Sequence, residues 1–333
     1  MTSYSISFEP FVSVIIPTLN EEKYIGKCLE SLANQTYPKN KFEVLVIDGL
    51  STDNTLNIAK GFRDKIYLRI LKNPRVKHVF ALNEGIRRAR GDFFVVISGH
   101  SFVERDFLEK SVKTFAEVRK NEPKLAAVGG RIVMVYENSF ARLVSLLFTS
   151  PFSGVSSFWY STKASFASTV AFGFYDKKIV IKVGFFDEDM IKGQDFELNL
   201  RLYRRGYKLY YNPNIRSYYY ARNNLKSFLK QTFDNGIAKG LCVRKGYIRA
   251  IWFVPSAFVI YSLFLFIEPF LRSVWPFSFA PLGVYWIANI FLSAKVAKKK
   301  IQIFLLPLMF WILHSVAGIG FVIGLLFGKK VLN

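Results

Sequence analysis

The stretch Val12–Glu22 (VSVIIPTLNEE) begins as a nearly continuous apolar run and becomes polar after Pro17. An apolar run of this length, closed by a proline, is typical of a strand that is buried on both faces of a parallel sheet. The apolar residues that follow, from Ile25 to Leu32, have helical spacing. The sequence therefore predicts a buried strand, a polar connection and a helix.

The same alternation of strand and helix patterns continues along the chain. Its next segments are Phe42–Ile47 (strand), Asn54–Phe62 (helix), Ile66–Leu71 (strand), Val79–Arg90 (helix) and Phe93–Ile97 (strand). Strands separated by helices of this length predict βαβ units and a mostly parallel sheet. Ligands of such sheets bind beyond the carboxyl ends of the strands. The candidate site loops are therefore Pro17–Glu22, Asp48–Asp53 and Ser98–Ser101.

The composition excludes several classes of protein. Of the 333 residues, 51% are apolar and 17% are aromatic, which is not the composition of a disordered chain. Two cysteines, Cys28 and Cys242, do not make a disulfide scaffold, and three histidines do not make a zinc site of several imidazoles. The net charge of +22 has two ordinary explanations, nucleic acid or an anionic membrane surface.

Three long apolar runs in the last third of the sequence favour the membrane. Uncharged runs of about 18 residues or more predict membrane-spanning helices. The third run would cross the bilayer with tilt or break at Gly318 or Gly320. We therefore predict a membrane domain over residues 250–328 with two or three transmembrane helices, at about 250–271, 274–294 and 301–328.

The distribution of positive charge predicts an orientation. Lys295–Lys300 contains four lysines, so the positive-inside tendency places it in the cytoplasm together with residues 1–249. Residues 222–249 are also basic, and Phe228 and Phe233 lie on an apolar stripe at helical spacing. This pattern predicts basic amphipathic helices in the headgroup plane, with a solvated basic face as the alternative. We thus expect a multi-pass protein of the cell membrane and no nucleic acid partner.

The strand ends carry short polar and acidic side chains in place of two common nucleotide-binding motifs. Neither GxGxxG after the first strand nor GxxxxGK[ST] occurs in the sequence. Short acceptors at strand ends suit the N–H groups of a nucleobase and the hydroxyls of a ribose. Ser51 and Asp53 would equally well cap the next helix. The residues concerned are Thr18, Asn20, Glu21, Asp48, Ser51 and Asp53.

Four segments, taken in order, resemble the motifs of family 2 glycosyltransferases: Val12–Glu22 (VSVIIPTLNEE), Val46–Thr55 (VIDGLSTDNT), Ala81–Asp92 (ALNEGIRRARGD) and Val183–Leu202 (VGFFDEDMIKGQDFELNLRL). The sequence is similar in particular to the succinoglycan-type branch, whose members extend lipid-linked oligosaccharides. The resemblance implies an α/β GT-A nucleotide-diphospho-sugar transferase fold over residues 1–221, with a mostly parallel sheet flanked by helices. The basic interfacial helices at 222–249 and the membrane domain would follow it.

The resemblance also assigns roles to matching residues. Asp195 matches the catalytic base of the inverting mechanism, which takes the proton from the acceptor hydroxyl. The alternative is that Asp195 or Glu197 only favours a helix N-terminus electrostatically. Gln194, Glu197 and Arg222 are expected on the acceptor side or in support of the base. The residues expected to bind the donor are Pro17, Thr18, Glu21, Asp48, Asn83, Ser98 and Gly99.

The expected metal site departs from the family pattern. The expected cofactor is a divalent metal, manganese or magnesium, which relatives hold with Asp-x-Asp or Asp-x-His at the end of the fourth strand. This sequence has Ser98-Gly99-His100 there. Magnesium prefers oxygen ligands, whereas an imidazole suits manganese better. Three alternatives follow: His100 binds manganese together with the phosphates, His100 replaces the metal as a cation, or the metal site is lost.

The resemblance implies an inverting glycosyltransferase of polysaccharide or glycan assembly. It would move a sugar from a nucleotide diphosphate donor to a lipid-linked, polyprenyl-type acceptor at the cytoplasmic face of the membrane. Two alternatives stay open. One is a polyprenyl-phosphate monoglycosyl synthase, whose acceptor is a bare lipid phosphate, and the other is a non-catalytic membrane protein that retains the nucleotide-sugar-binding fold. The sequence also leaves a homo-oligomer open.

Overall fold

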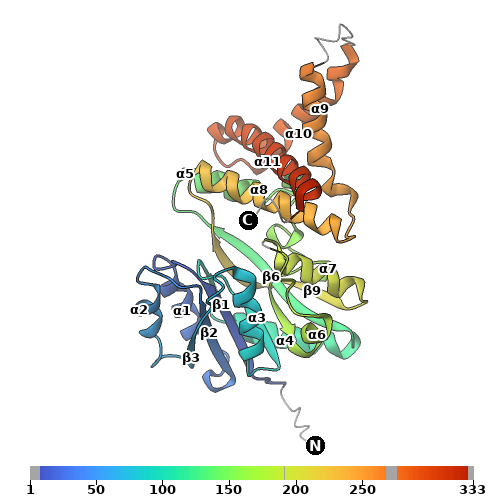
Figure 1. Ribbon diagram of the computed structural model, residues 1–333. Coiled ribbons are helices and arrows are strands. Elements are labelled where there is room, and N and C mark those ends of the chain that lie inside the picture. The colour runs from blue at the N-terminus through green and yellow to red at the C-terminus, as the bar shows by residue number, and fades with distance from the viewer. Residues whose placement is uncertain (1–7, 191, 268–275, 329–333) are drawn as a thin grey trace, which may run out of the picture. The chain divides into compact units, whose positions relative to one another are not determined.

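The computed structural model describes residues 8–190, 192–267 and 276–328 (Figure 1). Residues 268–275, which belong to the predicted membrane spans, lie outside the described part. The chain forms two compact units. The first consists of Met1–Val133 and Ser161–Tyr220, and the second of Met134–Tyr160 and Ala221–Asn333.

One mixed sheet forms the centre of the first unit. Its strand order is β3-β2-β1-β4-β8-β6-β9-β5, and β7 pairs with β9. The first four strands in this order are parallel, as predicted, whereas β8 is antiparallel to β4 and to β6. The sheet is therefore mixed rather than mostly parallel. The strands are β1 (Val12–Thr18), β2 (Phe42–Asp48), β3 (Leu68–Lys72), β4 (Phe93–Val96), β5 (Ser101–Val103), β6 (Leu125–Val135), β7 (Ser165–Ala167), β8 (Ala171–Asp176) and β9 (Lys208–Tyr220).

Helices pack against this sheet. α1 (Ile25–Ala33) buries the apolar residues whose spacing predicted a helix, and they join the core formed by β1 and β2. α3 (His78–Arg88) packs on β1 and β2, and α4 (Phe107–Asn121) packs on β8 and β9. The predicted strand–helix alternation is confirmed. The remaining helices of this unit are α2 (Thr55–Lys60), α6 (Lys177–Val183) and α7 (Gln194–Arg204).

The register of the parallel strands brings the predicted site loops together. Thr18 pairs with Asp48, so β1 and β2 end at the same level. β4, the other neighbour of β1, ends at Val96 and leads into the loop that contains His100. Because the carboxyl ends of parallel strands meet at one edge of a sheet, the three loops lie along the same edge.

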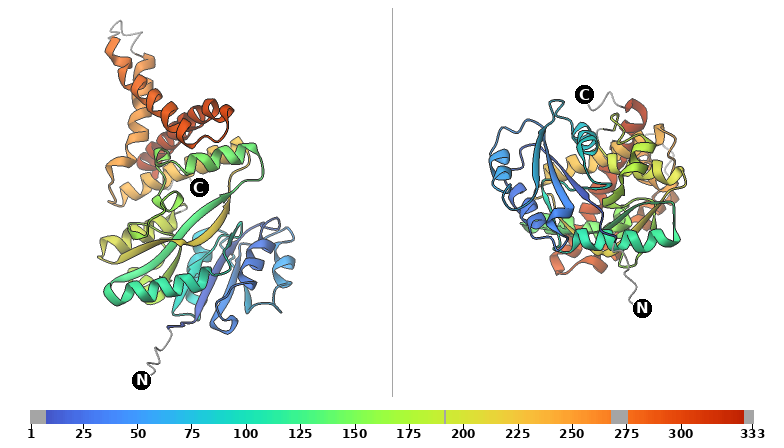
Figure 2. Two further views of the ribbon diagram at one scale, coloured as in Figure 1. Left: turned by 180° about the vertical axis from the view of Figure 1, so that it is seen from behind. Right: turned by 90° about the horizontal axis from the view of Figure 1, so that it is seen from below.

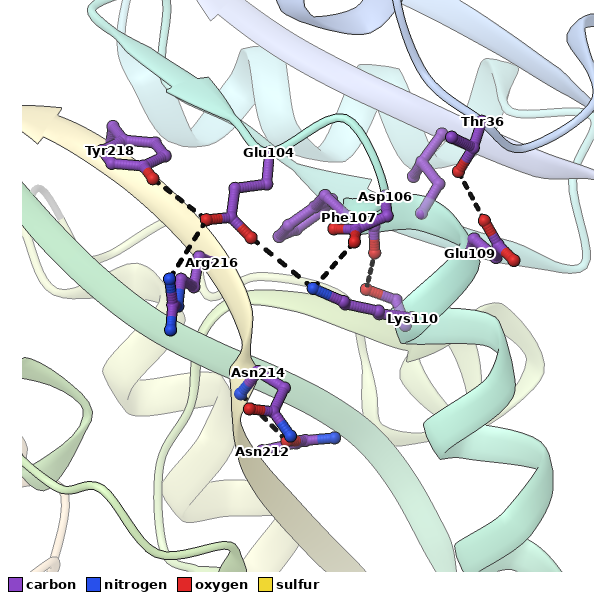
Figure 3. A network of polar contacts seen from close by, with 12 residues as sticks. Thr36, Glu104, Asp106, Phe107, Glu109, Lys110, Asn212, Asn214, Arg216 and Tyr218 are labelled. Carbon is purple, nitrogen blue, oxygen red and sulfur yellow. Dashed lines mark hydrogen bonds and ion pairs between the residues drawn. The ribbon is translucent and has the colours of Figure 1, made fainter.

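A polar network fixes the pairing of β5 with β9 (Figure 3). Glu104, just after β5, accepts a hydrogen bond from the Tyr218 hydroxyl (3.0 Å). The same carboxylate lies 3.6 Å from the Lys110 ammonium and 3.5 Å from the Arg216 guanidinium. Since β5 pairs with β9 at Tyr219, this network also holds that tyrosine next to the third site loop.

The second unit is built from helices. α5, α8 and α11 enclose an apolar core that includes Val144, Phe228 and Phe310. α9 and α10 are successive helices joined by a hydrogen bond from the Tyr261 hydroxyl to the Ser278 carbonyl, and in Figures 1 and 2 they extend away from the layer of α8 and α11. The helices are α5 (Ser139–Phe148), α8 (Leu225–Arg244), α9 (Val254–Ile267), α10 (Ala280–Val296) and α11 (Lys300–Phe327).

Two helices within the described residues are long and apolar enough to cross a membrane, Phe277–Val296 and Lys300–Phe327. The first predicted run contains a shorter apolar helix, α9. α11 is continuous through Gly318 and Gly320, so the break considered there does not occur. The basic segment forms a helix, α8, that begins at Leu225.

Candidate active site

The loops after β1 and β2 hold each other through side-chain and backbone hydrogen bonds. Asn20 has a positive φ of 54°. Its side-chain oxygen accepts from the Thr52 N–H, and its own N–H donates to the Ser51 hydroxyl, both at 2.9 Å. The Asp53 carboxylate accepts from the Thr55 N–H at the start of α2 (3.0 Å). These contacts support the interpretation that Ser51 and Asp53 fix the loops and the helix start.

Asp48 ends β2 and is 2% exposed. Its carboxylate accepts hydrogen bonds from the N–H groups of Leu50 (3.1 Å) and Ser51 (3.2 and 3.3 Å) in the following turn. A carboxylate has about four lone-pair positions, so Asp48 retains capacity for a ligand N–H. The turn therefore fixes the orientation of Asp48, and its contact with the donor stays a prediction.

Pro17 and Thr18 end β1 beside Asp48. The Thr18 carbonyl oxygen accepts a hydrogen bond from the Gly49 N–H (2.8 Å). A Cβ atom at Gly49 would lie 3.2 Å from the Val76 carbonyl oxygen and 3.3 Å from that of Thr18. Glycine at this position thus permits the close approach of the loops, and donor binding by Pro17 and Thr18 stays a prediction.

The third loop joins the first through Glu21 and His100. His100 Nδ1 lies 2.7 Å from Glu21 Oε1, and His100 Nε2 lies 3.3 Å from the Tyr219 hydroxyl. Because an ionised carboxylate only accepts, Nδ1 carries the hydrogen and Nε2 faces Tyr219. A Cβ atom at Gly99 would lie 2.9 Å from Glu21 Cγ, so glycine permits this contact. The Ser98 carbonyl accepts hydrogen bonds within its own loop.

The side chains in this loop do not fit a metal site built by the chain alone. Among the residues that the structure describes, no three His, Cys, Asp or Glu side chains gather where they could hold a metal ion. Because Glu21 is paired with His100 Nδ1, this pair offers a metal ion one nitrogen ligand, His100 Nε2. Magnesium and calcium require several oxygen ligands. We therefore derive no catalytic step through a metal held by these residues.

Asn83 holds the segment that leads towards α7. It is 1% exposed, and its amide nitrogen donates to the Phe186 carbonyl (2.9 Å) and to Glu188 (3.2 Å). Its amide oxygen accepts from the Phe186 N–H (3.0 Å). The amide is thus used within the chain, which supports a positioning role, and a direct contact of Asn83 with the donor stays a prediction.

Asp195 lies in the first turn of α7, after Gly193 with a positive φ of 69°. Its side chain is exposed to solvent. The surrounding protein atoms nevertheless desolvate the carboxyl and raise its pKa, and the backbone N–H of Phe196 offsets part of this shift. A carboxylate with a raised pKa is a stronger base than an ordinary aspartate. Asp195 therefore has the property that the predicted base requires.

A chain of buried hydrogen bonds supports α7 near Asp195. The Tyr175 hydroxyl donates to the Asn199 side-chain oxygen (2.8 Å). The Asn199 amide nitrogen donates to the Thr169 hydroxyl and to the Val170 carbonyl, both at 2.9 Å. The charge of Asp195 adds to the burial that raises the pKa of Tyr175, which shows that the two groups are close.

The other residues predicted on the acceptor side have different surroundings. Glu197 is 2% exposed and forms an ion pair with Arg201 (2.7 Å). Arg201 also donates to two main-chain carbonyls at and after the end of α6. This cluster supports the interpretation of Glu197 as a residue that holds α7 in place. Gln194 is 6% exposed at the start of α7. Arg222 belongs to the second unit, and its role stays a prediction.

Two basic residues that the sequence analysis did not single out lie in the same neighbourhood. Desolvation and the charges of Lys192 and His100 lower the pKa of His78 to about 4. His78 begins α3, and Lys192 precedes α7 by two residues. A histidine with this pKa is neutral near pH 7, so Lys192 is the group of this pair that contributes positive potential, which favours an anion. The sequence could have indicated this positive charge only through the position of Lys192, three residues before Asp195.

A separate cavity of about 430 Å³ lies away from these loops. It is lined in part by Phe93, at the start of β4, and by Asp176, at the end of the antiparallel strand β8. Both residues are at the opposite edge of the sheet from the carboxyl ends of β1 and β2. This cavity therefore does not belong to the candidate active site.

The first unit has the GT-A fold of nucleotide-sugar transferases: a parallel half-sheet, with Glu21 in the loop after β1 and Asp48 at the end of β2, extended by antiparallel strands. A solved structure of the same fold is the mannosyltransferase PcManGT from Pyrobaculum calidifontis in complex with GDP-Man and Mn2+. The two structures align with a TM-score of 0.61 over 96% of this chain and 88% of that chain, at 18% sequence identity. The predicted fold class is confirmed.

The chain belongs to glycosyl transferase family 2, whose family model matches residues 13–182. It is 42% identical to a dolichyl N-acetyl-alpha-D-glucosaminyl phosphate 3-beta-D-2,3-diacetamido-2,3-dideoxy-beta-D-glucuronosyltransferase of Methanococcus voltae, over 96% of this chain and 98% of that protein. It is also 29% identical to the glycosyltransferase AglE of Haloferax volcanii, over 73% of this chain and 80% of the relative. The chain is thus an enzyme that transfers glycosyl groups, and the predicted family is confirmed.

Proposed function

We propose that this glycosyltransferase moves one sugar from a nucleotide diphosphate donor to a lipid-linked acceptor at the cytoplasmic face of the membrane. The observation that carries the proposal is the Asp195 carboxyl, which is exposed to solvent but has a raised pKa. The relative from Methanococcus voltae supports the acceptor class, because its name describes transfer to a dolichyl-linked N-acetylglucosaminyl phosphate. The similarity to that relative extends over both units of the chain.

In the proposed reaction Asp195 acts as general base. Its carboxylate takes the proton of the acceptor hydroxyl while that oxygen attacks the anomeric carbon of the donor sugar. The bond from the anomeric carbon to the phosphate oxygen breaks, and its electron pair leaves with the nucleoside diphosphate. Attack from the face opposite the leaving group inverts the configuration at this carbon. The raised pKa of Asp195 favours the proton transfer.

On the other side of the sugar, the leaving diphosphate requires positive charge. Lys192 supplies positive charge from the chain itself, and it lies close enough to His78 to lower the pKa of that histidine, which is therefore neutral near pH 7. Asp48 and Thr18, at the ends of adjacent strands, would bind the nucleoside of the donor. Manganese or magnesium in the assay tests whether a divalent ion adds to this charge.

The second unit supports attachment to the membrane. Phe277–Val296 is long and apolar enough to span a bilayer, and exposed apolar side chains such as Ile287 (72%) and Phe277 (79%) would otherwise face water. Lys295 lies in the last turn of this helix, and Lys298, Lys299 and Lys300 follow it. The positive-inside tendency then places that loop in the cytoplasm.

The test is a transfer assay with the full chain in lipid nanodiscs. UDP- and GDP-linked sugars are offered as donors, and dolichyl-phosphate-linked N-acetylglucosamine or bare dolichyl phosphate as acceptor, with Mn2+, Mg2+ or EDTA. Mass spectrometry should find the glycosylated lipid extended by one sugar. A product formed only from bare dolichyl phosphate would contradict the proposal and favour the monoglycosyl synthase.

A further inference from the structure

α11 satisfies the same length and composition criteria for a membrane span as Phe277–Val296, but its packing differs. In the most apolar 18-residue stretch of each helix, 33% of α11 is buried inside the protein, compared with 11% of Phe277–Val296. Figures 1 and 2 show α11 lying along α8, whereas α9 and α10 point away from both. The neighbours of α11 therefore decide whether it spans the bilayer.

Glycines bring the backbones of α8 and α11 into direct contact. Gly236 and Gly240 on α8 face Gly320 and Gly324 on α11. A Cβ atom at Gly236 would lie 2.3 Å from the carbonyl oxygen of Ala317, and one at Gly240 would lie 2.8 Å from the carbonyl carbon of Gly324. Side chains larger than hydrogen would separate the helices, so this contact is close and specific.

The contact extends over nearly the whole of α8. At its start, Phe228 shares an apolar cluster with Leu306 and Phe310 of α11. At its end, the Arg244 guanidinium donates to the carbonyls of Leu325 (2.8 Å) and Leu326 (3.2 Å). Both helices thus run side by side in the same direction.

α8 carries charged residues along its length, and this restricts where α11 can lie. Lys226, Lys230, Asp234, Lys239 and Arg244 extend over about 27 Å at 1.5 Å per residue. Asp234 is paired with Lys230 (3.2 Å). If α11 crossed the hydrocarbon core, α8 would have to cross beside it and bring these charges into the core, which is costly.

α11 contacts the start of α9 and the middle of α10. The Ser256 hydroxyl at the start of α9 donates to the Gly318 carbonyl (3.2 Å), and the Asn289 amide in α10 donates to the Pro307 carbonyl (2.9 Å). Towards the tip of the α9–α10 hairpin, large apolar side chains are exposed, among them Leu263 (58%), Phe266 (74%) and Phe277 (79%). From the contact at Asn289 to Phe277 the hairpin extends about 18 Å beyond α11, about half the thickness of the hydrocarbon core.

We infer that the α9–α10 hairpin inserts into the membrane from the cytoplasmic side, while α11 lies with α8 along its cytoplasmic surface. The inference rests on the membrane attachment proposed above. The partner of α11 is the boundary between headgroups and acyl chains of an anionic leaflet, since α8 beside it is basic. The exposed apolar side chains of α11 follow one helical stripe and would enter this boundary: Ile301, Phe304, Leu308, Trp311, Ile319 and Leu326.

Single cysteines test the topology. In a Cys28→Ser, Cys242→Ser background, Phe277→Cys marks the hairpin tip, Lys298→Cys the α10–α11 connection and Leu326→Cys the end of α11. A membrane-impermeant maleimide should label none of the three in intact cells. It should label Lys298→Cys and Leu326→Cys after the membrane is opened, whereas Phe277→Cys, in the hydrocarbon, should stay unlabelled. Labelling of Leu326→Cys in intact cells, on the side opposite to Lys298→Cys, would overturn the inference.

A depth measurement decides the question without relying on reactivity at one position. Nitroxides at Leu308→Cys in α11 and at Leu263→Cys in α9 are compared in anionic vesicles by their collision rates with oxygen and with a polar nickel chelate. Leu263 should be deep, and Leu308 should be shallow. Equal depth for both labels would overturn the inference. Recovery of the chain as a soluble protein without detergent would overturn the proposed attachment itself, and leaves the transferase assay unaffected.

Discussion

Asp48 and Asp195 are both carboxylates of the candidate active site, but their surroundings are opposite. Asp48 is 2% exposed and receives main-chain hydrogen bonds from Leu50 and Ser51. Asp195 is exposed to solvent, and desolvation raises its pKa. Hydrogen bonds to a carboxylate stabilise its charged form, whereas desolvation disfavours it. Main-chain hydrogen bonds therefore fix the orientation of Asp48, whereas the raised pKa of Asp195 favours proton uptake by that carboxylate.

Under the proposed mechanism, this difference separates donor binding from the chemical step within one unit. The loops around Asp48 hold each other before any ligand arrives, as the contacts of Asn20 with Ser51 and Thr52 show. The buried Tyr175–Asn199 hydrogen bond holds α7 in place, and Asp195 at the start of this helix stays accessible to solvent. Substitutions at the two carboxylates should therefore change different steps of the reaction.

The largest effect is expected for Asp195→Asn. The amide keeps the shape of the side chain but cannot take the acceptor proton, so the transfer rate should fall by about 10²- to 10⁴-fold. The donor affinity should stay near that of the wild type. Because desolvation disfavours the charged carboxylate, the neutral variant should melt at the same or a slightly higher temperature near neutral pH. Initial rates, UDP and GDP titration and thermal unfolding provide the three measurements.

The matched control is Glu197→Gln, two residues closer to the middle of α7. Glu197 is paired with Arg201 in a buried position, and breaking such a pair typically costs about 3–5 kcal/mol of stability. This variant should unfold at a lower temperature but still transfer sugar while it is folded. If Asp195→Asn retained most of its activity, the hydroxyl-attack mechanism would be wrong, and an acceptor that is already anionic would be favoured.

The second effect in size is expected for Asp48→Asn. A hydrogen bond to a charged group contributes about 1.5–3 kcal/mol, so donor affinity should fall by about 10- to 100-fold. Calorimetric titration with UDP and GDP measures this loss at a pH where Asp195 is ionised. The bound enzyme should react at nearly the wild-type rate. A variant with unchanged affinity for both nucleotides would remove Asp48 from the donor site.

The raised pKa of Asp195 predicts the acid limb of the pH–rate profile. An ordinary aspartate has a pKa of about 3.9, and desolvation shifts that of Asp195 upwards. The base is lost as the pH falls through its pKa, so kcat/KM should begin to fall at a higher pH than for an ordinary aspartate. Below that pKa the loss is about tenfold per pH unit for a single proton. The residual activity of Asp195→Asn should lack this limb, and an unchanged limb would assign it to another group.

The sequence predicted those parts of the fold that depend on local patterns. The apolar run of β1 and the spacing from Ile25 to Leu32 need only neighbours along the chain. The antiparallel half of the sheet was not predicted, because the pairing of β5 with β9 joins residues more than 100 positions apart. Composition could not distinguish α10 from α11 either, because the charges that restrict α11 lie on α8.

For the site, the rule of strand ends and the family resemblance located Glu21, Asp48 and His100, and the structure places their loops along one edge of the sheet. The partners of these side chains were not predicted. Tyr219 is separated from His100 by 119 positions, so no local sequence motif predicts their contact. His78 is placed by the start of α3, and only the folded chain brings it near Lys192.

The smallest effect is expected at His100. His100→Gln removes one imidazole but leaves the positive charge of Lys192, so UDP affinity should fall by about 3- to 10-fold, the equivalent of roughly one hydrogen bond. With EDTA present, the wild type should keep most of its affinity if the chain supplies the charge itself. Tyr219→Phe is the matched control, because it removes only the hydroxyl that lies 3.3 Å from His100 Nε2. Complete loss of UDP binding in EDTA, with recovery in Mn2+, would show instead that a metal ion carries this charge.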